Sequence, residues 1–125
     1  MKKLAKLGFA VEVEHDAGLA AGFDDESYVA AGATITPSES VWASDVVAKI
    51  RPPADDEVGR LNGSQTIISY PYPAFNGETV QKLAARGVNA IAMDQVPRTT
   101  RAQKVDALSS MGNLSGYRAI VEAVN

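Results

Sequence analysis

Hydrophobic residues along this chain are gathered into short runs instead of being spread evenly. Three of these runs contain Val or Ile and lack alternation with polar residues, at 45–50, 66–69 and 88–93. Such runs are typical of parallel strands whose two faces are both covered. The apolar residues at 9–13 predict one further strand, which follows the Gly8 turn.

Helical patterns lie between these runs. Residues 54–61 and 77–86 each have acidic side chains near their start, where the positive end of a helix dipole favours them. Residues 25–31 follow the same rule, with the carboxylates of Asp24, Asp25 and Glu26 at the start and Gly32 at the end. Apolar residues at helical spacing predict a last helix from Ser110 to the end of the chain.

The alternation of strands and helices predicts an α/β fold. We expect an open, mostly parallel sheet with helices on both faces, of the flavodoxin or Rossmann-like kind. The chain starts with about two turns of helix over residues 1–7, and no strand precedes them. We therefore expect the first strand of the sheet to be missing. No linker or repeat interrupts the pattern, so residues 1–125 are expected to form a single α/β domain.

Composition excludes several classes of protein. The chain is 46% hydrophobic and 22% charged, as is usual for a globular protein that folds in water. Its net charge of −3 does not suit nucleic-acid binding, so we expect no nucleic-acid partner. No run reaches the roughly 18 to 20 apolar residues that span a bilayer, and the early lysines lead into no apolar signal segment. We expect a protein that is neither exported nor embedded in a membrane.

The available side-chain chemistry is narrow. The sequence has no cysteine, and its one histidine is His15, which lies in a predicted turn. These counts exclude disulfides, thiol nucleophiles and sites that need two imidazoles, and we expect no metal. The chain contains no G-x-G-x-x-G motif and therefore no glycine-rich nucleotide-binding domain.

Lys49 is the least expected residue in the predicted strands. It lies in the apolar run 46–50, where a buried ammonium is costly unless it has a partner. The side chain either extends out of the sheet edge into water or faces an anion, and the pattern leaves both open. Trp42, near the start of the same predicted strand, is expected to pack in the core or at its rim.

The densest group of polar residues is at 96–110, after the last predicted strand. Thr100 and Gln103 match the S/T-x-x-E/Q capping box, which predicts the start of a helix there. Gln103, Asp106 and Ser110 would then share one helical face. Such a polar face is usually solvated, and a functional role is the alternative.

The same segment carries a resemblance to a known family. The chain resembles the alpha subunit of proton-translocating NAD(P) transhydrogenases over nearly its whole length. The similarity is densest at 93–98, 101–103, 106–111 and 113–119, and it includes 6–9, 23–25 and 41–42. Alanine dehydrogenases are the second family, and they resemble the chain less around 98–109.

The resemblance implies an NAD(H)-binding subunit that exchanges hydride with NADP(H) on a partner domain, coupled to proton movement through a membrane domain. It implies that Arg98, Asp106 and Ser109 lie near NAD(H), that Gln103 reaches the opposing nicotinamide, and that Gln103 and Asp106 are the catalytic pair. Lys49 and Tyr117 are further candidates. Direct hydride transfer needs alignment and a suitable field, and no acid, base or metal from the protein.

The resemblance also implies partners and a location. The partners are the NADP(H)-binding and membrane domains, and the full-length protein is expected to be a homodimer. The location is cytoplasmic, peripheral to the inner membrane through partner subunits. The chain itself would be a truncated part of the N-terminal subdomain, inactive in isolation. Two alternatives stay open, namely an alanine dehydrogenase-like fragment and a non-catalytic α/β binding or assembly module.

Overall fold

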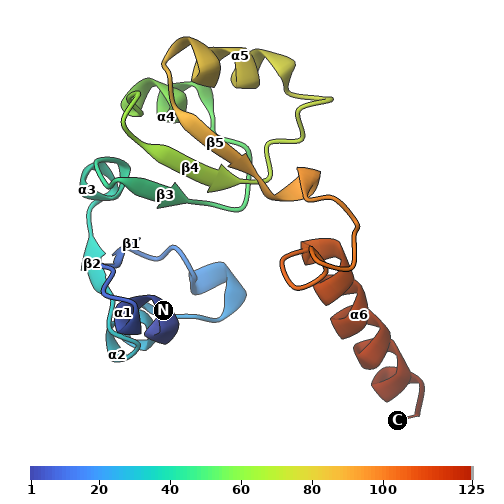
Figure 1. The fold of residues 1–125 in the computed structure, drawn as a ribbon. Coiled ribbons are helices and arrows are strands. Elements are labelled where there is room, and N and C mark those ends of the chain that lie inside the picture. Colours follow the sequence, from blue (N-terminus) through green and yellow to red (C-terminus); the bar gives the residue numbers. More distant parts are fainter. Residues whose placement is uncertain (125) are drawn as a thin grey trace. The chain divides into compact units, whose positions relative to one another are not determined.

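The computed structural model describes residues 1–124 and divides the chain into two compact units, Met1–Val47 and Ala48–Asn125 (Figure 1). Each unit is described by itself. Both contain parallel strand pairs joined through helices, which confirms the predicted α/β class with parallel sheets. No helix within residues 1–124 is long and apolar enough to cross a membrane.

The first unit is built around two short parallel strands. Strand β1 pairs with β2, and Val13 lies opposite Ile35. Helix α3 contacts β1 and helix α2 contacts β2, and their contacts bury Val13, Ala33 and Trp42. The elements are α1 (Lys2–Lys6), β1 (Glu12–Glu14), η1 (Leu19–Ala21), α2 (Asp25–Ala30), β2 (Thr34–Thr36) and α3 (Ser38–Trp42).

Helix α2 begins at Asp25, as the acidic residues Asp24, Asp25 and Glu26 predicted. The Asp24 carboxylate accepts hydrogen bonds from the Ser27 N–H at 2.8 Å and from the Ser27 hydroxyl at 2.5 Å. These bonds lower the pKa of Asp24. The carboxylate therefore satisfies a backbone donor that the first turn leaves without a partner.

Three predictions for the first unit need correction. The strand predicted at 9–13 is the shorter β1, Glu12–Glu14. Strand β2 and helix α3 were not predicted, because three- and five-residue elements are too short for a periodic pattern to develop. Trp42 is the last residue of α3, four residues before β3 begins at Val46, and its predicted place in the core is confirmed by an exposed fraction of 6%.

A second sheet has the order β3-β4-β5, and its first strand, β3, crosses the boundary between the units along the chain. Strands β4 and β5 are parallel, with Ile67 opposite Ala90, and the three arrows point the same way in Figure 1. The elements are β3 (Val46–Ala48), α4 (Asp55–Arg60), β4 (Thr66–Ser69), α5 (Gly77–Ala85), β5 (Asn89–Ala92), η2 (Met93–Gln95) and α6 (Ala107–Val124).

Helices α4 and α5 contact each other, and α5 also contacts β5 of this sheet. Lys82 of α5 pairs with Asp55 of α4 at 2.6 Å. Arg86 donates from Nε to the Leu61 carbonyl at 2.9 Å, which ties the end of α5 to the end of α4. Leu61 and Ile67, each 1% exposed, are the most buried large side chains of the described residues.

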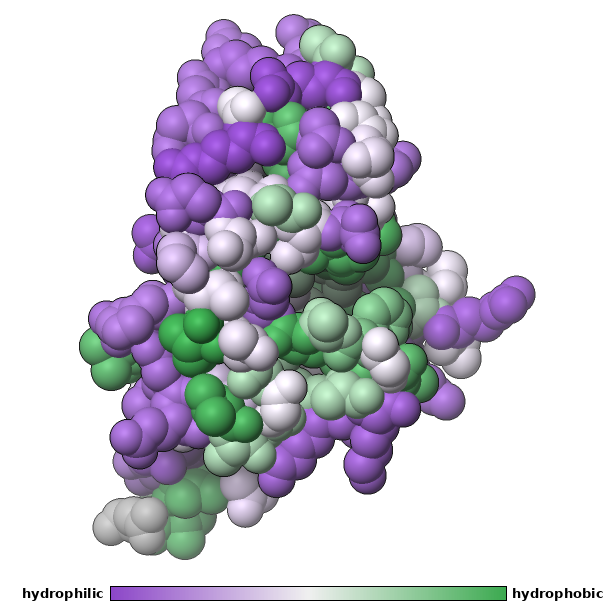
Figure 2. All heavy atoms as spheres, turned by 90° about the vertical axis from the view of Figure 1, so that its left-hand side faces the viewer, coloured by the Kyte–Doolittle hydropathy of each residue, from purple (hydrophilic) through white to green (hydrophobic). Residues whose placement is uncertain are grey.

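None of the described residues of helix α6 is buried, although it is the longest helix described. Its predicted start at Ser110 is three residues late, and its predicted end at Asn125 lies outside the described residues. Large exposed hydrophobic side chains also occur elsewhere, and Figure 2 shows hydrophobic groups among hydrophilic ones on one face. Those of α6 are Leu108, Met111, Leu114, Tyr117, Ile120 and Val124.

Candidate functional site

The segment between β5 and α6 does not form the helix that the capping box predicted. Residues 99–105 are turns, in which the Gln103 N–H donates to the Thr99 carbonyl at 3.1 Å. The helix starts only at Ala107, after Asp106. The prediction that Thr100 caps a helix is therefore wrong, and so is the shared helical face of Gln103, Asp106 and Ser110.

Asp106 caps this helix instead. Its Oδ1 accepts from the Leu108 N–H at 3.0 Å, and its Oδ2 accepts from the Ser109 hydroxyl at 2.6 Å. The Ser109 hydrogen bond is the largest cause of a lowered Asp106 pKa, and the positive charge of Arg98 acts in the same direction. The residue is only 7% exposed. The turn before α6 therefore holds an ionised, largely buried carboxylate at neutral pH.

Three of the predicted site residues come together at this point. Asp106 bonds Ser109 directly, and Arg98 acts on Asp106 through its charge. Gln103 is exposed on the turn that joins Arg98 to Asp106. Tyr117 lies further along α6 with 71% of its surface exposed. The structure thus groups Arg98, Asp106 and Ser109, the three residues expected near NAD(H). Gln103 lies between Arg98 and Asp106 in the sequence, and its side chain is exposed to solvent.

Lys49 faces an anion within its own unit. Its ammonium pairs with the carboxylate of Glu57, and both side chains are about one-fifth exposed, at 21% and 23%. Glu57 Oε2 also accepts from the Ala54 N–H at 2.7 Å, at the start of α4. Of the two interpretations of Lys49, the structure favours the one with an anionic partner, and that partner is internal.

The carboxyl ends of β4 and β5 carry two further features, of which the sequence indicates one, because Tyr70 and Tyr72 flank Pro71 at a strand exit, where such rings line a pocket or simply pack. The Tyr70 and Tyr72 rings stack with centroids 6.5 Å apart, and Tyr72 has a positive φ of 45°. Asp94, just after β5, keeps one buried carboxylate oxygen without a hydrogen-bond partner in the described chain. Its place directly after the strand that the run 88–93 predicted is a signal that the sequence carries, because ligands bind at that edge of α/β sheets.

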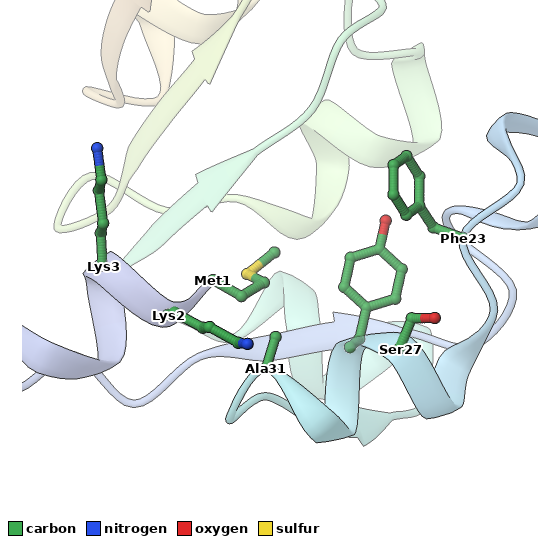
Figure 3. Close-up of a pocket in the computed structure, with 7 residues that line it drawn as sticks. Met1, Lys2, Lys3, Phe23, Ser27 and Ala31 are labelled. Carbon is green, nitrogen blue, oxygen red and sulfur yellow. The ribbon is translucent and has the colours of Figure 1, made fainter.

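A pocket of about 690 Å³ lies in the first unit (Figure 3). Its walls are mostly apolar, and Phe23 and Tyr28 form a tilted aromatic pair 6.5 Å apart. None of the predicted site residues lines the pocket, whose walls are Met1, Lys2, Lys3, Phe23, Ser27, Tyr28 and Ala31.

Within residues 1–124, one set of side chains of metal-ligating type gathers, namely His15, Asp16 and Asp25, with ligand atoms within 4.8 Å of one another. The two ring nitrogens of His15 point to different carboxylates, Nδ1 to Asp16 at 2.9 Å and Nε2 to Asp25 at 3.4 Å. An imidazolium satisfies both contacts, whereas a metal takes only one ring nitrogen. We assign no metal to this group.

Comparisons with known proteins point to one family. The family model for the N-terminal domain of alanine dehydrogenase/PNT matches residues 1–115. The NAD(P) transhydrogenase subunit alpha of Haemophilus influenzae is 45% identical over 100% of this chain and 24% of its own length. The chain thus spans about a quarter of that relative.

Solved structures agree with the sequence comparisons. The transhydrogenase of Sinorhizobium meliloti superposes with a TM-score of 0.87 and 38% identity, over 98% of this chain and 37% of that one. An L-alanine dehydrogenase superposes with a TM-score of 0.75 and 31% identity, over 81% of this chain and 28% of that one.

Proposed function

Because the chain belongs to the alanine dehydrogenase/PNT N-terminal domain family, we propose that it is part of the NAD(H)-binding subunit of a proton-translocating transhydrogenase. Residues 1–125 would be a single α/β domain within the N-terminal part of that subunit. The reaction would be hydride transfer between NAD(H) and NADP(H). The transhydrogenase relatives support this choice over alanine dehydrogenase, with identities of 45% and 38% against 31%.

One observation carries the proposed site. A largely buried, ionised carboxylate, Asp106, lies beside a hydroxyl, Ser109, and within the electrostatic influence of a guanidinium, Arg98. A carboxylate accepts hydrogen bonds from ribose hydroxyls or a carboxamide, and a guanidinium pairs with phosphate oxygens. This set of donors and acceptors fits a nicotinamide dinucleotide.

The residues of the chain would act by binding and alignment. Asp106 and Ser109 would fix one part of NAD(H), and Arg98 would add positive charge near its phosphates. Gln103, exposed on the adjoining turn, would contact the nucleotide on the partner domain. The bound nicotinamides supply the hydride donor and acceptor, so the protein needs no proton-transfer residue at this site.

The remaining parts of the proposal concern the complete protein. NADP(H) would bind a separate partner domain, and a membrane domain would carry the proton. The subunit would form a homodimer and lie in the cytoplasm, peripheral to the inner membrane through its partners. Lys49 and Tyr117 would be further residues of the site. Lys49 would contribute through its ion pair with Glu57 after the end of β3, and Tyr117 through its exposed ring on α6.

The test separates helix capping from nucleotide binding. Asp106→Asn keeps a good capping residue and removes the charge, because Asn and Asp cap helices about equally well. In the complete enzyme the variant should fold normally, bind NAD(H) more weakly and lose turnover. A displacement of about 1 Å in the nicotinamide can cost on the order of 100-fold in rate. Gln103→Asn should lower hydride transfer more than NAD(H) affinity.

The chain offers a matched control. Asp24 caps α2 with bonds from the Ser27 N–H and hydroxyl, much as Asp106 caps α6 with bonds from the Leu108 N–H and the Ser109 hydroxyl. Asp24→Asn should therefore reproduce the effect on helix capping and leave hydride transfer unchanged. If Asp106→Asn and Asp24→Asn give equal activities per folded molecule, Asp106 is only a helix cap and the proposed site is wrong.

A further inference from the structure

The loop between β4 and α5 is the most aromatic segment of the chain. Residues 70–76 include Tyr70, Tyr72 and Phe75 and carry no charged side chain. Phe75 is 88% exposed, and Tyr72 is about half exposed. Enrichment in Tyr and Phe together with depletion of charge distinguishes the centre of a protein interface from the rest of a protein surface. The loop therefore has the composition of a binding surface.

This loop is held in one conformation although it is exposed. Tyr72 has a positive φ of 45°, which a bulky L residue rarely adopts. Its carbonyl accepts hydrogen bonds from the Phe75 N–H at 2.9 Å and from the Asn76 N–H at 3.0 Å. The Asn76 side chain also donates to the carbonyl of the buried Pro71 at 2.9 Å. A surface that is already ordered loses less conformational entropy on binding, so these bonds favour association.

The end of β3 extends the aromatic loop. The Tyr70 N–H donates to the Ile50 carbonyl at 3.2 Å, so Ile50 lies beside Tyr70 at the same edge of the sheet. Ile50 is 79% exposed, and Arg51, which follows it, is exposed as well. Arginine is enriched at protein interfaces together with aromatic residues. We call this set of residues the edge patch, namely Ile50, Arg51, Tyr70, Tyr72 and Phe75.

The edge patch and the proposed nucleotide site follow the carboxyl ends of the same sheet. Strands β4 and β5 are parallel with Ser69 opposite Ala92, so the loop after β4 begins beside the segment that leads to Arg98. The arrowheads of β3, β4 and β5 point the same way in Figure 1. Direct hydride transfer requires two nicotinamides in contact, and Gln103, exposed on the turn after Arg98, would reach the second one. The domain that carries the second nicotinamide must therefore approach this edge.

We propose that the edge patch is a docking surface for the NADP(H)-binding partner domain. This inference rests on the proposed function and adds a surface to it. The patch contains one guanidinium and no carboxylate, so the partner surface that fits it is apolar at its centre, with an acidic group opposite Arg51. The patch would align the partner domain with Gln103 and take no part in NAD(H) binding.

Photo-crosslinking in the complete enzyme identifies what covers the patch. Phe75→p-benzoylphenylalanine keeps an aromatic side chain at an exposed position and bonds covalently to its neighbours on illumination. Mass spectrometry of the product should find peptides of the NADP(H)-binding domain. The matched control is Ala85→p-benzoylphenylalanine, because Ala85 is also exposed but ends α5 shortly before β5 begins, at the other end of the strands. The control should give no such product. The proposal fails if position 75 links only to its own subunit or to a second copy of it.

Kinetics separate docking from nucleotide binding. Phe75→Ser, at a largely exposed position, should fold normally and lower hydride transfer about tenfold, as truncation of an important interface residue does, with the Kd for NADH unchanged. Phe75→Tyr keeps the ring and should keep the rate. A raised Kd for NADH in Phe75→Ser would overturn the docking role, because the ring would then line the nucleotide pocket. If Asp106→Asn leaves NADH binding unchanged, the proposed function is at fault instead, whatever position 75 links to.

Discussion

The ion pair between Lys49 and Glu57 can be tested by removing each charge alone and then both together. Lys49→Met keeps the length of the side chain and removes the cation. Glu57→Gln removes the anion but keeps an oxygen that can accept from the Ala54 N–H, as Gln does in a capping box. Comparison of the single and double variants then isolates the interaction of the two charges.

The degree of burial sets the expected size of the effect. Exposed pairs contribute up to about 1 kcal/mol, whereas breaking a fully buried pair costs about 3–5 kcal/mol. Lys49 and Glu57 are 21% and 23% exposed, so each single variant should lose about 1–2 kcal/mol. The loss of stability in the double variant should be smaller, by about 1 kcal/mol, than the sum of the losses in the two single variants.

Urea unfolding followed by far-ultraviolet circular dichroism measures these differences, and in thermal unfolding 1 kcal/mol corresponds to about 3–5 °C for a chain of this length. Glu57→Ala should cost about 1 kcal/mol more than Glu57→Gln, because it also leaves the Ala54 N–H without its acceptor. A coupling below about 0.3 kcal/mol would refute the pair as a stabilising interaction. Wild-type stability of Lys49→Met combined with weaker nucleotide binding in the complete enzyme would assign Lys49 to a ligand instead.

Three further outcomes are expected. Ile67→Ala, at a position 1% exposed, should cost about 2–5 kcal/mol in urea unfolding, and Ile50→Ala, at a position 79% exposed, should stay within about 0.5 kcal/mol. Calorimetric titration of the 125-residue chain with NADH should give a Kd no tighter than the millimolar range, a binding free energy of about −4 kcal/mol. The reason is that the sequence has no glycine-rich phosphate loop. Micromolar binding would contradict the proposed site. Hydrogen bonding to a serine hydroxyl lowers the pKa of both Asp24 and Asp106 in the folded chain. The stability that each carboxylate contributes should be fully present above its ordinary pKa of 3.8 and lost as the pH falls through the lower pKa of the folded chain, so Asp24→Asn and Asp106→Asn should show less steep acid unfolding.

The sequence predicted the second unit better than the first, and length explains the difference. Strand β4 was predicted with its observed bounds, Thr66–Ser69, because a buried apolar run flanked by turn residues is unambiguous. Helix α5 was also predicted closely, since its nine residues allow more than two turns of periodic pattern. Strand β2 and helix α3 lack that length, and their formation depends on contacts with β1 and α2 that no local pattern encodes.

The position of the cap before α6 shows a different limit. Thr100 and Gln103 satisfy a capping motif as well as many true helix starts do, yet the chain makes turns there. Asp106 satisfies the simpler Asp-x-x-Ser pattern, with the hydroxyl of Ser109 as donor. Both patterns were present in the sequence. The cap that forms is the one whose carboxylate also lies under the influence of the Arg98 charge, a tertiary feature that neither local pattern encodes.

The two Asp-x-x-Ser caps also show which property can distinguish a functional carboxylate from a structural one. Asp24 and Asp106 each accept from a serine hydroxyl three residues on and from one backbone N–H, that of Ser27 for Asp24 and that of Leu108 for Asp106. Both have a lowered pKa whose largest cause is the serine hydroxyl. Capping therefore explains the hydrogen bonds and the pKa of each residue equally well. It does not explain why Asp106 alone is buried and near a guanidinium, since a solvated cap stabilises a helix without either feature. Burial and a nearby guanidinium are thus two features of Asp106 that helix capping does not require. If they serve nucleotide binding, Asp106→Asn should lower activity where Asp24→Asn does not.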